Sequence, residues 1–204
     1  MAAHKTLESF GVVMPRTKVL KMLHKHGVPW KTFGIPPARS LDDLFMYHER
    51  DCFNFRNGSA KTCIVDVYVA VVLVVHRFNR KWYELYEEKQ VFTNGEVLVR
   101  DNFNGIAETI KRGESLREGA TRCLGEELCF RNPAKYELSE CLGIEHREPI
   151  PSEKFPGIMA AYHRHVFECT ISRALYCPDG YAEQEGNKTV YFKWKPCHQL
   201  GFRI

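Results

Sequence analysis

The longest hydrophobic segment of the chain covers residues 62–76, TCIVDVYVAVVLVVH, and holds a single acidic residue, Asp66. A nearly continuous Val-rich segment of this length is typical of a strand that is buried on both faces. Residues 82–92 predict a second strand, and the Asn94-Gly95 pair after it favours a tight hairpin turn. A third strand is then predicted over residues 96–101.

Residues 104–130 change to a helical pattern. Gly113 marks a turn, Ser115 is a favourable N-cap, and Glu118 lies three residues later, as in a capping box. Leucine and alanine recur at helical spacing, so one side of this helix is predicted to face a core. The residues of that apolar stripe are Leu116, Ala120, Leu124 and Leu128.

Two shorter helices are predicted before the first strand. One covers residues 15–26 and stops at Gly27. The other covers residues 40–47, with Ser40 as its N-cap. The pair predicts a small N-terminal helical module, which with the tail before it occupies residues 1–60.

Later strands are predicted over residues 136–147, 162–172 and 189–194. Strands on both sides of one central helix are typical of an α/β fold in which helices pack on a mixed sheet. The sequence therefore predicts one α/β domain over residues 61–204.

The charge of the chain is unevenly distributed. Its 204 residues carry a net charge of +4, and residues 1–39 hold seven of the 29 Lys and Arg residues but one of the 25 acidic residues. A basic segment can attract the phosphates of a nucleotide or of RNA, but a solvated basic helix surface is the favoured interpretation. Both interpretations stay open.

Eight cysteines are present without a Cys-x-x-Cys pair, which argues against a zinc ribbon. We expect reduced thiols and an intracellular location, cytoplasmic or alternatively mitochondrial. The first residues lack the apolar segment of a secretory signal, and the apolar residues 63–75 are too few to cross a bilayer. No membrane partner is predicted.

Acidic residues gather around the central helix. Glu126 and Glu127 offer two neighbouring carboxylates, and Glu114 on the preceding loop can supply a third. Hard cations such as Mg²⁺ prefer these oxygen ligands. Arg122 and Glu126 are four residues apart, where unlike charges pair on a helix. The pattern predicts a metal site, although a solvated helix face has similar charges.

This segment resembles the Nudix box, the loop-helix-loop of the Nudix hydrolase superfamily. Gly113 and Glu114 match the early glycine and glutamate of that pattern, Arg122 matches its arginine, and Glu126 with Glu127 match its paired acids. The chain departs from the pattern at Ala107, Glu108, Lys111, Cys123 and Cys129.

Cys123 stands where the family has a glutamate, and a thiol is a poor ligand for Mg²⁺. It is therefore not predicted to bind the metal. The chain resembles a divergent eukaryotic member of the superfamily with a degenerate box.

The resemblance covers residues 61–196 and implies an α/β/α sandwich with a mixed sheet. It implies a Mg²⁺- or Mn²⁺-dependent hydrolase of a pyrophosphate bond in a nucleoside diphosphate derivative. Glu114, Glu126 and Glu127 would then be the metal ligands.

In this interpretation the metal neutralises pyrophosphate oxygens and lowers the pKa of a bound water. Arg122 would orient the glutamates through an ion pair. Because Cys123 replaces a glutamate that is the general base in much of the family, Glu183 or Glu185 from a later loop is the predicted base. A solvated acidic turn is the competing interpretation of these two residues.

Two other functions remain open. A catalytically weak or inactive module that binds RNA or a nucleotide is favoured by Cys123 and by the basic N-terminal segment. A protein-interaction scaffold is the third possibility, but a scaffold has no need of Glu114, Glu126 and Glu127 around one point.

Aromatic residues and histidines add further candidates. Phe155, Tyr162 and Trp194 can stack on a base, although Trp194 is predicted to be a core residue. His163 and His165 are two apart on a predicted strand and share a face. A partly exposed strand surface is favoured over a metal site there, since the sequence offers no third ligand.

Overall fold

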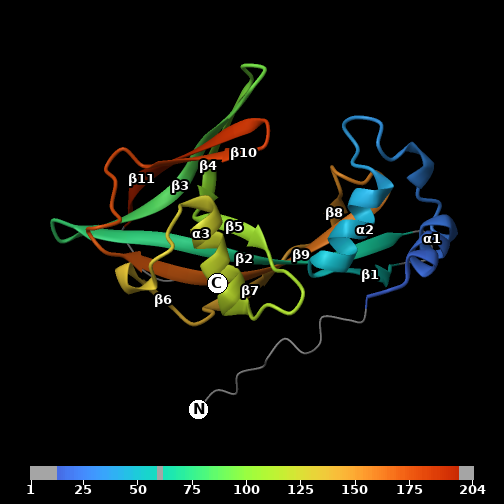
Figure 1. The fold of residues 1–204 in the computed structure, drawn as a ribbon, viewed down its shortest axis with the longest axis horizontal. Helices are drawn as coiled ribbons and strands as arrows, with labels where there is room; N and C mark the ends of the chain where they lie inside the picture. The colour runs from blue at the N-terminus through green and yellow to red at the C-terminus, as the bar shows by residue number, and fades with distance from the viewer. Residues whose placement is uncertain (1–12, 59–61, 198–204) are drawn as a thin grey trace, which may run out of the picture. The chain divides into compact units, whose positions relative to one another are not determined.

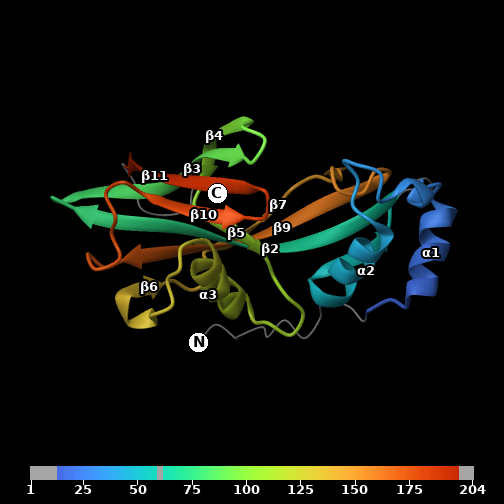
Figure 2. The same cartoon turned by 45° about the horizontal axis from the view of Figure 1, so that its top comes forward.

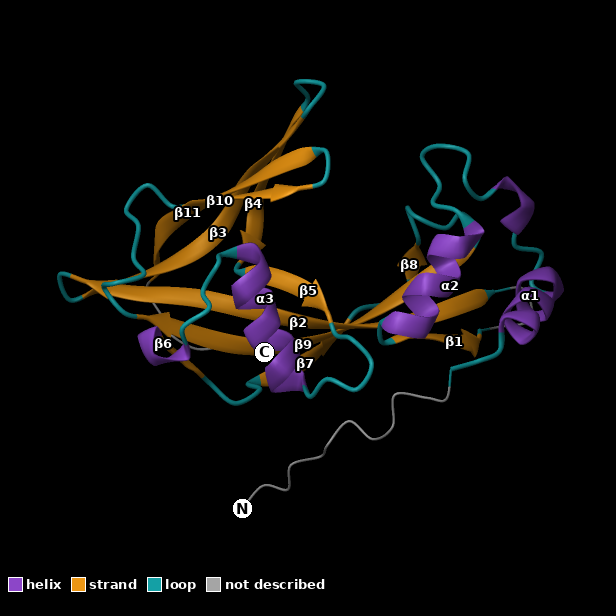
Figure 3. Ribbon diagram, viewed as in Figure 1, coloured by secondary structure: helices purple, strands orange, loops and turns teal. Residues whose placement is uncertain are grey.

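The computed structural model describes residues 13–58 and 62–197. Figure 1 shows a sheet with few helices, and Figure 3 separates strands from helices by colour. At this level the predicted α/β fold, a mixed sheet with few helices, is confirmed, while the α/β/α sandwich stays a prediction. No helix among the described residues is long and apolar enough to span a membrane.

The chain divides into two compact units, each made of three segments. Unit 1 consists of Met1–Val69, Thr109–Leu116 and Glu145–Arg164. Unit 2 consists of Ala70–Glu108, Arg117–Ile144 and His165–Ile204. The long strands β2 (Cys63–Phe78) and β9 (Ile158–Ile171) contribute residues to both units.

Both predicted N-terminal helices are present in unit 1, as α1 (Arg16–Lys25) and α2 (Leu41–Arg50). Ser40 caps α2 as predicted, because its Oγ accepts from the Asp43 backbone N–H at 3.0 Å. The short helix η1 (Trp30–Thr32) lies between them in the chain. Whether residues 1–60 form a module of their own stays a prediction.

The strands of unit 1 include two short ones that the sequence pattern did not reveal. β1 (Phe53–Asn57) pairs antiparallel with the start of β2, and β8 (Ile150–Pro151) pairs with the start of β9. In Figure 1, α2 lies beside β1. The helices and strands bury one apolar core, which includes Val19, Leu23, Leu44, Phe155 and Ile158.

Unit 2 holds the hairpin and the central helix. β3 (Lys81–Phe92) and β4 (Val97–Asn104) pair antiparallel as predicted, and the turn between them contains Gly95 at φ 86°. The helix α3 (Leu116–Glu127) lies next to the sheet in Figures 1 and 2. β5 (Ile106–Thr109) pairs with β2.

The remaining strands correct two predictions. The single strand expected over residues 136–147 is divided into β6 (Tyr136–Leu138), after the short helix η2 (Pro133–Lys135), and β7 (Gly143–His146). The expected loop around Glu183 and Glu185 contains strand β10 (Tyr181–Glu185). β10 pairs antiparallel with β11 (Lys188–Cys197), and β11 pairs with β3.

Candidate active site

The helix α3 turns its predicted apolar stripe toward the interior of unit 2. Ala120 and Leu124 are fully buried and Leu128 nearly so, and Cys123 is buried with them. Because these residues fix the rotation of the helix, its acidic and basic residues are left on the remaining surface.

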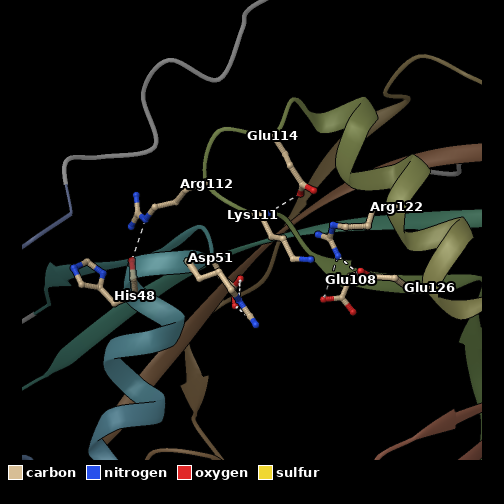
Figure 4. Close-up of polar contacts among 9 residues, drawn as sticks. His48, Asp51, Glu108, Lys111, Arg112, Glu114, Arg122 and Glu126 are labelled. Carbon is tan, nitrogen blue, oxygen red and sulfur yellow. Dashed lines mark hydrogen bonds and ion pairs between the residues drawn. The ribbon is translucent and has the colours of Figure 1, made fainter.

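Arg122 makes the ion pair that its spacing predicts. Its Nη1 lies 2.7 Å from Glu126 Oε2 and 3.9 Å from Glu108 Oε1, as Figure 4 shows. The Arg122 side chain is 16% exposed, whereas that of Glu126 is 46% exposed. The guanidinium therefore holds the Glu126 carboxylate in place, and a catalytic role of this pair stays a prediction.

Glu127 lies in a different environment from its neighbour Glu126. Burial of its side chain raises the pKa of Glu127 to about 9, and a hydrogen bond with Glu183 adds to the effect. The negative charges of Glu183, Glu108 and Glu185 raise this pKa further. At neutral pH the metal-free site therefore keeps a proton on Glu127.

Glu183 contributes an oxygen that is left without a partner. Its Oε2 is buried and has no hydrogen bond to any described residue. Burying such an atom unpaired costs free energy unless a proton or a cation satisfies it. Glu127 and Glu183 thus form an acidic pair in which one carboxylate oxygen has no hydrogen bond within the described part of the chain.

A cavity of about 260 Å³ in unit 2 opens beside this pair. Glu127 and Glu185 line it together with two basic residues, Arg100 and Lys188. Lys188 Nζ lies 2.8 Å from Glu185 Oε2 and donates to Gln90 Oε1 at 3.2 Å. The cavity therefore presents carboxylates and basic groups to the same space.

Glu114, the third predicted metal ligand, belongs to unit 1, whereas Glu126 and Glu127 belong to unit 2. Within unit 1 its Oε2 accepts a hydrogen bond from the Lys111 backbone N–H at 2.9 Å (Figure 4). Gly113 next to it has φ 81°, which fits the predicted turn. The association of Glu114 with the other acids stays a prediction.

The predicted bases Glu183 and Glu185 lie on a strand, which corrects the expectation of a loop. β10 begins directly after Gly180, whose φ is 84°. A Cβ at this position would collide with the backbone carbonyl oxygen of Phe192 on β11. Gly180 therefore permits the close approach of the two strands that sets β10 in place.

Cys123 is unsuited to replace the family's glutamate. Burial, followed by the neighbouring carboxyl groups of Glu127 and Glu108, holds the pKa of the Cys123 thiol well above its ordinary value. A thiol that stays protonated does not bind a hard cation. All eight cysteines of the chain are free, and Cys52, Cys63 and Cys169 are buried as well.

Several residues of the site were not identified from the sequence, among them Glu108, Arg100 and Lys188. Glu108 stood out only as a departure from the family pattern, and Arg100 and Lys188 belong to strands without any distinctive spacing. Arg100 lies on β4 and Lys188 on β11. The two residues reach the same cavity because both strands pair with β3. The only feature of the sequence that could have indicated Arg100 and Lys188 is that each is a basic residue on a strand of a hairpin.

The other candidates lie elsewhere. Phe155 is 1% exposed in unit 1, where it lines a separate cavity of about 330 Å³ together with Tyr162. Trp194 is half-buried, and its Nε1 donates to the Cys177 carbonyl at 2.8 Å. Burial in a core therefore accounts for Phe155.

The donor atoms present fit Mg²⁺ or Mn²⁺. Among the described residues, no group of three or more His, Cys, Asp or Glu side chains is arranged to hold a metal ion. Mg²⁺, however, is commonly held by one or two carboxylates together with water and substrate phosphates. The carboxyl groups of Glu183, with its unpartnered oxygen, and Glu127 are such a pair of donors.

Comparisons with known proteins give no sequence match. No family model matches the chain, and no curated protein matches it. Among solved structures, it is similar to the C. elegans Ap4A hydrolase at 14% identity, with a TM-score of 0.37 over 64% of this chain and 80% of that one.

A binary complex of that hydrolase gives a TM-score of 0.38 at the same identity and coverage. The NUDIX domain of Shewanella oneidensis NrtR, complexed with ADP ribose, gives a TM-score of 0.33 at 13% identity, over 64% of this chain and 73% of that one. At these TM-scores the likeness carries no conclusion about function, which is argued from this chain's own residues.

Proposed function

We propose that the chain is a Mg²⁺- or Mn²⁺-dependent hydrolase of a pyrophosphate bond in a nucleoside diphosphate derivative. One observation carries the proposal: the cavity where Glu127 and Glu185 lie with Arg100 and Lys188. Carboxylates can hold a hard cation, and basic side chains can bind phosphate oxygens. The resemblance of residues 113–127 to the Nudix box suggests the reaction that these carboxylates and basic side chains support, which is metal-dependent hydrolysis of a pyrophosphate bond.

Each group of the site has a role in the proposal. Glu127 and Glu183 hold the cation, with Glu126 and Glu114 as the further ligands that the box implies. A bound Mg²⁺ supplies charge neutralisation of the phosphate oxygens and lowers the pKa of a bound water. Ionised Glu127 becomes favourable only when positive charge replaces its proton.

The chain's own residues complete the chemistry. Arg100 and Lys188 donate hydrogen bonds to the diphosphate oxygens and orient the phosphorus toward the attacking water. Glu185 accepts the proton of that water as general base, since its side chain is 61% exposed and lines the same cavity. Glu183 is the alternative base.

The activity is tested by incubating the purified full chain with Mg²⁺ or Mn²⁺ and a panel of substrates. The panel contains nucleotide sugars, dinucleoside polyphosphates, dinucleotide cofactors and capped RNA, and the products are separated by chromatography. We expect cleavage of at least one substrate, and its loss in Glu127→Gln. The control Glu137→Gln alters an exposed glutamate on β6 and should leave the rate unchanged.

The roles of the two acids of β10 are separated by kinetics and by metal binding. Glu185→Gln should lower kcat on the order of 100-fold, a typical contribution of general base catalysis, and leave Mg²⁺ affinity unchanged. Glu183→Gln should weaken Mg²⁺ binding in a calorimetric titration. If both variants keep the wild-type kcat and the wild-type affinity, neither acid has the proposed role.

Cys123 favours a second function, a module that binds RNA or a nucleotide without cleaving it. Its buried, protonated thiol supplies no carboxylate where the family has one. No cleavage across the panel, together with RNA binding that weakens steeply with added salt, would support this module and reject the hydrolase.

A further inference from the structure

Unit 1 contains a chain of hydrogen-bonded side chains that the proposed hydrolase does not use. Asp66 Oδ1 lies 3.0 Å from His163 Nε2, and the other ring nitrogen of His163, Nδ1, lies 2.8 Å from His146 Nδ1. Asp66 is also paired with Arg56, whose Nε lies 2.8 Å from its Oδ2. The ring of Tyr68 stacks on that of His163, with centroids 4.7 Å apart.

With both imidazoles neutral, these contacts assign one proton to each ring. The Asp66 carboxylate accepts a hydrogen bond, so His163 carries its proton on Nε2 and keeps the lone pair on Nδ1. His146 must then donate from Nδ1 to that lone pair. A carboxylate that accepts from one ring nitrogen and leaves the lone pair of the other for a ligand is the arrangement that orients many metal-bound histidines.

We propose that His146 and His163 bind one late first-row divalent metal ion, such as Zn²⁺ or Ni²⁺, through their Nδ1 atoms. The ion takes the position of the proton that His146 Nδ1 shares with His163 Nδ1, and that same proton moves to Nε2 of His146, so both imidazoles stay neutral. Asp66 orients His163 without touching the metal, and water completes the coordination. Imidazole ligands favour these metals over Mg²⁺, so this site is distinct from that of the hydrolase.

The spacing of the two nitrogens suits this exchange. At metal–nitrogen distances of about 2.05 Å, two imidazole nitrogens lie about 2.9 Å apart at a right angle and about 3.3 Å apart in a tetrahedron. The observed 2.8 Å must therefore increase by roughly 0.1–0.5 Å. His146 is exposed and lies at the end of strand β7, so it can move, whereas His163 is 20% exposed and held by Asp66 and Tyr68.

The experiment follows the imidazole nitrogens directly. Full-length protein with ¹⁵N-labelled histidine is titrated with Zn²⁺, and two-bond ¹H–¹⁵N spectra report the state of every ring nitrogen. Without metal, we expect a protonated Nε2 and an unprotonated Nδ1 for His163, and the reverse for His146. One equivalent of Zn²⁺ should shift the Nδ1 signals of both residues and convert His146 to the Nε2–H form.

Variants test the assignment. His146→Ala and His163→Ala should each abolish the shift of the remaining Nδ1, and Asp66→Asn should weaken Zn²⁺ binding about 10–100-fold, the usual effect of losing such a carboxylate. His24→Ala, at an exposed position of α1, is the matched control and should bind as wild type does. Circular dichroism confirms that each variant is folded.

The proposal is overturned if Zn²⁺ leaves both Nδ1 signals unchanged, or shifts them equally in His146→Ala and wild type. It is also overturned if Zn²⁺ binds only at thiols, which leaves the imidazole spectrum unperturbed. None of these outcomes bears on the hydrolase, since Asp66, His146 and His163 have no role in it.

Discussion

Replacement of Glu127 by glutamine should change how the stability of the protein depends on pH. Burial and the neighbouring carboxylates raise the pKa of Glu127 from 4.5 to about 9 in the folded chain. Between these values the unfolded chain has lost the proton that the folded chain keeps. The folded state therefore binds more protons, and the free energy of unfolding falls as pH rises through this window.

The size of the effect follows from the width of the window. For a single group with a fully shifted pKa, each pH unit above 4.5 lowers the free energy of unfolding of the protein by at most about 1.4 kcal/mol. From pH 5.5 to pH 8 the ceiling is thus about 3.5 kcal/mol. Because Glu183 and Glu185 share the charge and solvent reaches part of the site, we expect roughly 2 kcal/mol.

The assay is urea unfolding in EDTA at pH 5.5 and pH 8, followed by circular dichroism. Glutamine imitates the protonated acid, so Glu127→Gln should lose less stability than wild type over this range, by about 2 kcal/mol. Glu126→Gln is the control, because its carboxylate is paired with Arg122 and is 46% exposed. It should keep the wild-type pH dependence.

A Glu127→Gln protein whose stability changes with pH in parallel with wild type would refute the reasoning. Glu127 would then be ionised in the folded chain at neutral pH, and the acidic pair would need no cation. When the series is repeated with Mg²⁺, the loss of stability between pH 5.5 and pH 8 should become smaller in wild type but not in Glu127→Gln, because a bound cation stabilises the ionised pair.

Three further predictions concern positions around the site. Gly180→Ala should lower the free energy of unfolding in urea by about 2–4 kcal/mol, because the added Cβ meets the Phe192 carbonyl at a position of positive φ. Gly125→Ala, where the added Cβ has open space around it, should raise that free energy by about 0.5–1 kcal/mol. Leu124→Ala removes a fully buried side chain of α3 and should cost about 2–5 kcal/mol, visible as a lower Tm. Arg122→Ala should cost less than about 1 kcal/mol of stability, since Glu126 is largely exposed, yet lower kcat/KM at least tenfold, with partial recovery in Arg122→Lys.

The pattern of hydrophobic residues was sufficient to predict a helix and a strand that contribute buried residues to the cores, α3 and β2. The apolar residues of β2 predicted a strand buried over most of its length, and the stripe of α3 predicted which side of the helix is buried. The Asn94-Gly95 pair predicted the hairpin of β3 and β4. In β2 and α3 the pattern repeats over many residues, so the preference for burial accumulates, whereas the Asn-Gly pair acts through the backbone conformation of the turn itself.

Short polar strands gave no comparable pattern. β10 contains Glu183, Gln184 and Glu185, and its sequence is as typical of a solvated turn as of an edge strand. It is defined by pairing with β11, which in turn depends on the absence of a Cβ at Gly180. The break between β6 and β7 was likewise invisible, because residues 136–147 carry no strong turn residue other than Gly143.

Three acidic residues around the cavity were singled out from the sequence, whereas its two positively charged residues were not. Glu127, Glu183 and Glu185 were identified from the box and from a later acidic segment, and the structure brings these three together. Arg100 and Lys188 could not be found from spacing, because the register of separate strands brings them to one cavity. Spacing along one helix can be seen in the sequence, whereas the register that brings side chains of separate strands together cannot.

The position of Cys123 explains why restoring the family's glutamate should fail. Cys123 is fully buried between Ala120 and Leu124 on the apolar side of α3, with the Glu127 and Glu108 carboxyl groups nearby. A carboxylate there would have to stay protonated or enter the core as an unpaired charge, which costs several kcal/mol.

We therefore expect Cys123→Glu to be less stable than Cys123→Gln by about 3–5 kcal/mol at pH 8, the cost of an uncompensated buried charge. The two variants share size and shape, so the difference isolates the charge, and it should shrink toward pH 5 as the new carboxyl takes up a proton. Urea unfolding at both pH values measures it. Equal stability at pH 8 would mean that solvent or a cation reaches position 123, and the loss of the family's glutamate would then have to be explained by something other than burial.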